Sequence, residues 1–165
     1  GAEGTLGIVT AARLRLVPAI AHRLTGWVGV ASPDAALALL RRLEARLGAM
    51  LEGFELIPQS CVDAVLAHIA GTRAPLPAHR GWHVLIEVAG DDDRAGDLLL
   101  HAGADAMAAG LASDMVLAKS AAEGDAWWRI RDAISEAERA AGPAIQHDVS
   151  VPVAAMPTFI ADNPA

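Results

Sequence analysis

The chain has 165 residues, 53% hydrophobic and 20% charged, a composition typical of one globular domain. Its net charge of −7 and its single lysine, Lys119, argue against a protein that neutralises nucleic-acid phosphates. Cys61 is the only cysteine, which excludes an intramolecular disulfide and favours a reducing cytoplasm. The sequence shows neither a long apolar run nor a signal-peptide pattern, so we expect a cytoplasmic protein without a transmembrane segment.

Hydrophobic period and turn residues predict strands and helices in near-strict alternation. Ser32, Pro33 and Asp34 suit the cap and first turn of the first helix, and Gly142 with Pro143 ends the last long one. The elements expected in chain order are extended pieces at 8–10 and 14–18, a strand at 24–31, a helix at 33–48, a strand at 54–58, a helix at 59–71, a loop at 72–81, a strand at 82–88, a helix at about 91–110, a strand at 114–119, a helix at 121–141, an extended segment at 145–153 and a helix from 156.

This alternation predicts an α+β fold, with helices on one face of a mainly antiparallel, ferredoxin-like sheet. Glu55, Glu87 and Lys119 fall within the expected strands, which favours a sheet with one solvated face. A doubly wound parallel sheet is the alternative.

Three glycines occur within the first seven residues, in the segment GAEGTLGIVT. Such a run lets the backbone approach a ligand closely and turn its amides toward anionic oxygens, with the Thr5 hydroxyl as a further donor. A flexible terminus is the alternative interpretation. The segment resembles GSEGTLGIVT, which closes the flavin-binding domain of FAD-linked oxidases, and Ala2 in place of serine is its one departure.

The helix expected at 121–141 carries a second candidate site. At 100° per residue, Trp128, Arg131 and Ser135 share one edge, beside an apolar stripe expected to face the sheet. Arginine offers paired donors that match a carboxylate. The alternative is an ordinary ion pair between Arg131 and a neighbour such as Asp132 or Glu138. The stripe consists of Ile130, Ile134, Ala137 and Ala141.

Two further segments resemble the same family. WRIRDAISEA at 128–137 is similar to its Trp-x-x-Arg-Glu-x-Ile segment, and IQHDVSVP at 145–152 is similar to its Lys-His/Tyr-Asp-Val/Leu-Ser-Val/Leu-Pro segment. The resemblance covers essentially the whole chain and points to D-lactate, D-2-hydroxyglutarate and glycolate dehydrogenases. It implies that residues 1–18 end an FAD-binding domain, and that 19–165 form a C-terminal substrate domain truncated at its C-terminus.

The resemblance also implies roles for individual residues. Arg131 matches the carboxylate-binding arginine of the family and Ser135 its hydroxyl-bearing substrate position. Gln146 stands where the family commonly has a lysine, and this uncharged amide weakens the case for a dicarboxylate such as 2-hydroxyglutarate. No catalytic base is assigned. The residues implied to bind FAD are Gly1, Glu3, Gly4, Thr5, Gly7 and Ile8.

The implied function is FAD-dependent oxidation of a small D-2-hydroxy acid to the 2-oxo acid by the intact protein, with the chain alone inactive. A divalent metal is left open for the intact protein, because the family's histidine segment would follow this chain, and His79 and His83 are expected to be structural. A homodimer is left open, as is the electron acceptor. The alternatives are a stand-alone ferredoxin-like module that binds or senses a small molecule without catalysis, and a purely structural dimerisation domain.

Overall fold

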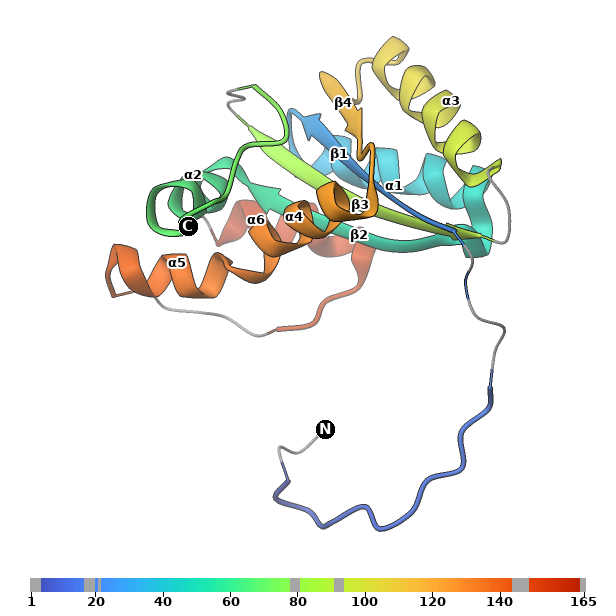
Figure 1. Cartoon of the computed structure of the whole chain (residues 1–165). Coiled ribbons are helices and arrows are strands. Elements are labelled where there is room, and N and C mark those ends of the chain that lie inside the picture. The colour runs from blue at the N-terminus through green and yellow to red at the C-terminus, as the bar shows by residue number, and fades with distance from the viewer. Residues whose placement is uncertain are drawn as a thin grey trace.

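A four-stranded antiparallel sheet forms the centre of the protein (Figure 1). The computed structural model describes residues 4–16, 20, 22–77, 81–90, 94–143 and 149–163. The strands follow the order β2-β3-β1-β4, so that the β1-α1-β2 and β3-α3-β4 units interleave, as in a ferredoxin-like sheet. The predicted α+β class and antiparallel sheet are confirmed. The strands are β1 (His22–Val30), β2 (Leu51–Pro58), β3 (Trp82–Gly90) and β4 (Asp114–Leu117).

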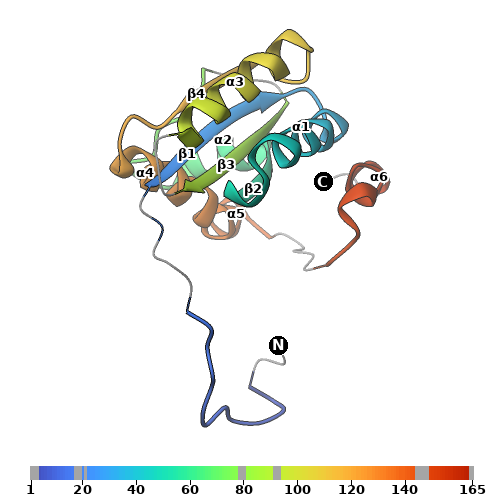
Figure 2. The same ribbon diagram turned by 90° about the vertical axis from the view of Figure 1, so that its right-hand side faces the viewer.

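Helices cover both faces of this sheet (Figures 1 and 2). The first group is α1 (Pro33–Leu47) with α3 (Arg94–Ala108), and the second is α2 (Gln59–His68), α4 (Ala121–Asp132) and α5 (Ile134–Ala141). The prediction that helices cover only one face is wrong, because the second group covers the other face. Alternate strand residues are apolar on both sides, as with Val84 and Leu85, so each face requires its own cover.

Local signals placed most helix starts well. The Ser32 hydroxyl accepts a hydrogen bond from the Ala35 amide at 3.2 Å, which caps α1 as predicted. Ser120 caps α4 in the same way, through the Glu123 amide.

The helix expected at 121–141 is divided at Ala133. This residue ends α4 with ψ at −3°, although its amide and carbonyl still bond to Arg129 and Ala137. The two pieces are therefore a bent continuation of each other. Alanine is a strong helix former, so no local signal marked the bend.

The remaining boundaries shift by a few residues. β1 and β2 begin earlier than expected, and β2 contains an irregularity between Leu51 and Gly53. Lys119 lies after β4 and not within it. A short helix, α6 (Met156–Asp162), confirms the predicted final helix and packs against α1. Of the segment expected to be extended at 145–153, residues 145–148 lie outside the described residues, 149–152 form no strand, and Val153 begins a 3-10 turn. Two single 3-10 turns complete the elements, at Gly48–Met50 and Val153–Ala155.

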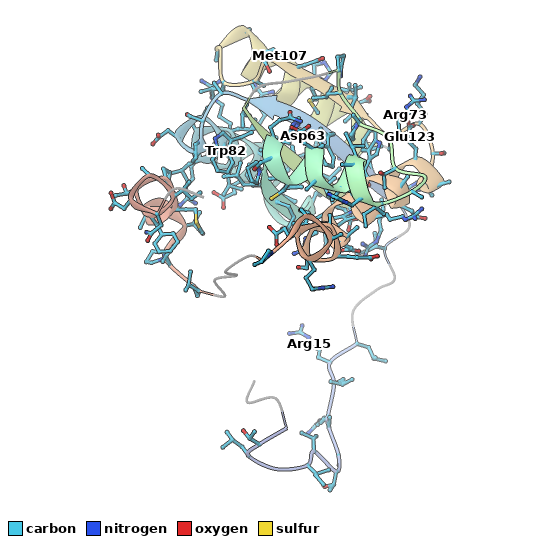
Figure 3. All side chains as sticks on the ribbon, turned by 90° about the vertical axis from the view of Figure 1, so that its left-hand side faces the viewer. Arg15, Asp63, Arg73, Trp82, Met107 and Glu123 are labelled. Atoms are coloured by element: carbon cyan, nitrogen blue, oxygen red, sulfur yellow. The ribbon has the colours of Figure 1, made fainter. Side chains whose placement is uncertain are left out.

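Residues 4–16 run away from the folded body in an irregular path (Figure 1). The expected extended pieces form no strand in this range, and every residue in it is exposed. Figure 3 shows Arg15 in this segment, well separated from Asp63 and Trp82 in the body. Within the described ranges, each helix is too short or too polar to cross a bilayer.

Candidate functional site

The polar residues of interest lie on the sheet face that α2, α4 and α5 cover. Odd-numbered residues of β1 and β3 point to this side, because successive strand residues alternate between faces. Trp27 and Leu85 form its apolar floor together with Trp127 and Ile130 of α4. Polar side chains at odd-numbered positions of β1 and β3 therefore face these helices.

Glu87 connects β1, β3 and α4. One of its carboxylate oxygens pairs with the Arg23 guanidinium, and the other accepts a hydrogen bond from the Trp128 indole at 2.9 Å. Glu87 is only 15% exposed, so both contacts satisfy a carboxylate that has lost most of its water. The contacts fix the position of Trp128 over the sheet.

Gly53 allows Trp128 to lie directly on β2. A Cβ atom built at Gly53 would stand 3.4 Å from the indole ring and 3.3 Å from the Glu87 Cβ atom. The Cβ atom of an alanine would touch the ring at an ordinary van der Waals distance, so a side chain longer than that of alanine would press against the indole. The missing side chain therefore sets how closely α4 approaches β2.

Arg131 lies about one helical turn after Trp128 on the same face of α4, and its side chain contacts Glu55 of β2. Its Nε atom is 3.3 Å from Glu55 Oε2, and its Nη2 atom is 3.4 and 3.5 Å from the two carboxylate oxygens. Its Nη1 atom is 3.4 Å from Asp132 Oδ1. An ion pair with a neighbour was the alternative to ligand binding, and the structure shows such pairs with Asp132 and, unexpectedly, with Glu55.

Ser135 lies in α5, just after Ala133, and is exposed. The predicted apolar stripe is confirmed for Ile130 and Ala137, which are buried; Ile134 is half-buried, and Ala141 is exposed. Gln146 lies outside the described residues, so the third expected substrate contact has no position here.

Four of the six expected flavin-binding residues are described, and they lie in the segment that leaves the folded body, not beside Arg131. Gly1 and Glu3 are outside the described residues, and Gly4, Thr5, Gly7 and Ile8 are exposed in the segment that leaves the body. Gly4 and Gly7 have φ values of 80° and 156°, which only glycine adopts without strain. The described residues supply no wall of a binding site around this segment.

A buried relay that the sequence did not indicate lies on the same face. The Trp27 indole donates to His83 Nδ1 at 2.9 Å, and His83 Nε2 donates to Gln59 Oε1 at 2.7 Å. Because Nδ1 accepts, the ring is neutral with its proton on Nε2. Its burial and these two contacts support the structural role expected for His83, while His79 lies outside the described residues. Trp27 and His83 are 56 residues apart, so sequence spacing held no signal of this contact.

Cys61 faces Glu138 across the α2–α5 contact, with 3.8 Å between the sulfur and Oε1. Burial raises the pKa of the Cys61 thiol above its ordinary value, and the charge of Glu138 raises it further. The thiol is therefore a poor nucleophile near neutral pH.

Other features of the described residues offer less chemistry. An apolar cavity of about 310 Å³ lies between α1, β2 and α6, with Leu40, Phe54 and Ile160 among its walls, and it contains no charged residue. Among the described residues, no group of three His, Cys, Asp or Glu side chains could hold a metal ion.

Comparisons with known proteins identify the family. Residues 20–164 match the family described as "FAD linked oxidases, C-terminal domain". The chain is 34% identical over its whole length to a D-2-hydroxyglutarate dehydrogenase of Xanthomonas citri pv. viticola and covers 34% of that protein. It is 32% identical over 93% of its length to a mitochondrial D-2-hydroxyglutarate dehydrogenase of Arabidopsis thaliana, covering 28% of it.

A more distant relative is a D-2-hydroxyglutarate–pyruvate transhydrogenase of Saccharomyces cerevisiae, which is 27% identical over 92% of the chain. The chain spans about a third of the length of these relatives. The family match covers every element from β1 to α6. The chain therefore belongs to the family of FAD-linked oxidases, as their C-terminal domain.

Proposed function

We propose that this chain binds the substrate of an FAD-dependent dehydrogenase, and that the intact enzyme oxidises a small D-2-hydroxy acid to the 2-oxo acid. The observation that carries the proposal is the Arg131 guanidinium. It lies at the exposed edge of the polar sheet face, and all its contacts to carboxylates measure 3.3 to 3.5 Å. Charge-assisted bonds of full strength measure about 2.7–2.9 Å. These donors are thus loosely occupied and available to a substrate carboxylate.

Each residue that is expected to bind the substrate has a distinct role. Arg131 binds the carboxylate through two parallel hydrogen bonds, and Ser135 and Gln146 add neutral donors that orient the hydroxyl-bearing carbon. FAD, when bound to the intact protein, would supply the acceptor for the hydride from that carbon. Residues 1–18 end the flavin-binding domain, with Gly1, Glu3, Gly4, Thr5, Gly7 and Ile8 at the cofactor, and residues 19–165 form the substrate domain.

The names of the relatives favour D-2-hydroxyglutarate as the substrate, with D-lactate and glycolate as alternatives. The dicarboxylate calls for a second cationic anchor besides Arg131, and the Gln146 position carries no charge. Relative rates on these three acids decide between them.

We further propose a cytoplasmic location, which the single cysteine supports.

The test is to purify the product of the complete gene and to screen the three acids with an artificial electron-accepting dye. We expect a yellow protein with flavin absorption that reduces the dye with at least one acid. A colourless protein without turnover would contradict the proposal, and metabolite binding by such a protein would favour the non-catalytic module.

The isolated chain provides a separate check. Because its glycine-rich segment has no surrounding walls in the described residues, we expect the 165-residue chain alone to bind negligible FAD and to show no turnover. Fluorescence quenching of added FAD measures this. Tight binding by the chain alone would show that residues 4–16 and the body suffice for the cofactor.

A further inference from the structure

Glu55 and Arg131 meet at the edge of the guanidinium that a carboxylate ligand would use. Both atoms of the Nε–Nη2 edge point at the Glu55 carboxylate, while Nη1 points at Asp132. A planar fork presents this edge to a carboxylate in two parallel bonds. Glu55 therefore already occupies the position that, under the function proposed above, belongs to the substrate.

The ion pair between Arg131 and Glu55 is weak enough for a ligand carboxylate to displace it. The Arg131 and Glu55 side chains are 44% and 37% exposed, so water screens their attraction. Their three contacts are also long, at 3.3 to 3.5 Å. An exposed ion pair with such geometry contributes little to folding. It still holds the guanidinium over β2 in one orientation.

The neighbouring contacts explain why Arg131 stays in register with Glu55. Gly53 and Glu55 lie on the same side of β2, and the Trp128 indole packs on Gly53 while donating to Glu87. Arg131 follows Trp128 by three residues and so lies on the same helix face. The indole contact thus places the guanidinium against Glu55.

We infer that Glu55 is a positioning residue that competes with the substrate carboxylate for the Nε–Nη2 edge of Arg131. This inference rests on the proposed function. Glu55 keeps the guanidinium ordered in the empty site and leaves it when a carboxylate arrives. Its negative charge then remains beside the bound ligand, where it disfavours anions that carry a second charge.

The substitution Glu55→Gln tests this directly. Glutamine retains an oxygen that can accept from Arg131, but it removes the competing charge. We expect 2-oxoglutarate, a dianion, to bind about twofold to fivefold more tightly to the variant of the full-length protein, since this range corresponds to one exposed ion pair. Pyruvate, a monoanion, should gain less. Isothermal calorimetry measures both dissociation constants without turnover.

Glu44→Gln is the matched control. Glu44 forms an exposed ion pair of the same kind with Arg41 on α1, at the opposite face of the sheet. The same change of charge there should leave both dissociation constants unchanged. A variant that merely loosened the fold would bind less tightly, so tighter binding is specific to competition.

Binding to Glu55→Gln that is unchanged, weaker or absent would overturn the role of Glu55. An equal gain in Glu44→Gln would overturn it as well, because the effect would then be one of net charge. The proposed function is judged separately, by turnover and flavin absorption of the wild-type protein. A wild-type enzyme that oxidises a 2-hydroxy acid while Glu55→Gln binds like wild type would retain the function and reject this inference.

Discussion

The two faces of the sheet differ in what their alternate residues do. The face toward α1 and α3 is packed with aliphatic side chains such as Leu39, Leu43 and Leu99. The face toward α2, α4 and α5 combines an apolar floor with hydrogen-bonded polar groups, including His83 and Glu87. The same strands thus provide a stabilising core on one side and a support for positioned side chains on the other.

The aliphatic face should show the largest effect on stability. Leu99 of α3 is fully buried, so Leu99→Ala removes apolar contacts and leaves a cavity. We expect the free energy of unfolding to fall by about 2–5 kcal/mol, measured by urea denaturation. Leu100→Ala is the control, because Leu100 is 53% exposed on the same helix and should cost at most about 0.5 kcal/mol. Equal losses would show that the packing of α3 differs from the one described.

The polar face should respond through unpaired hydrogen-bonding groups. His83→Leu replaces the imidazole with an apolar side chain of similar size and leaves the buried Trp27 indole N–H without its acceptor. We expect a loss of about 1–3 kcal/mol in the same denaturation experiment. His101→Leu, at an exposed position of α3, should change stability by less than about 0.5 kcal/mol. If His83→Leu were as stable as wild type, the hydrogen bonds of His83 would contribute nothing to the free energy of unfolding.

The edge between α2 and α5 should show a smaller, chemical effect. The raised pKa of Cys61 keeps the thiol protonated, so alkylation by iodoacetamide at pH 8 should be slower than that of a free thiol and should accelerate with pH. Stability from the neutral thiol is complete below the ordinary thiol pKa and declines as the pH rises through the raised one. Glu138→Gln should speed alkylation severalfold, whereas Glu136→Gln, at an exposed site, should not. Equal rates in both variants would exclude Glu138 as a cause.

The sequence was sufficient for the order of elements, because capping residues and hydrophobic period act over a few positions. It could not predict that α4 and α5 cover the second face, since that depends on how distant elements pack. The contact between Arg131 and Glu55 joins residues 76 positions apart, and only the approach of α4 to β2 creates it. The bend at Ala133 has no local signal either, and α5, which follows it, packs against α2.

The candidate site was predictable to a different extent. Arg131 could be selected because arginine beside an apolar stripe suits a carboxylate and because the segment resembles a known family. Glu55 could not, since a glutamate in a half-exposed strand is an ordinary surface residue until its partner is known. Its side-chain partner is the information that the structure adds.

The central claim, that Arg131 anchors the substrate carboxylate, is tested most directly by kcat/KM of Arg131→Ala in the full-length enzyme. A charge-assisted anchor is worth about 1.5–3 kcal/mol, so we expect kcat/KM for the preferred 2-hydroxy acid to fall about tenfold or more. The melting temperature should barely change, because the Glu55 pair is exposed. Arg41→Ala on α1 should keep the wild-type value. An Arg131→Ala enzyme with wild-type kcat/KM would contradict the account.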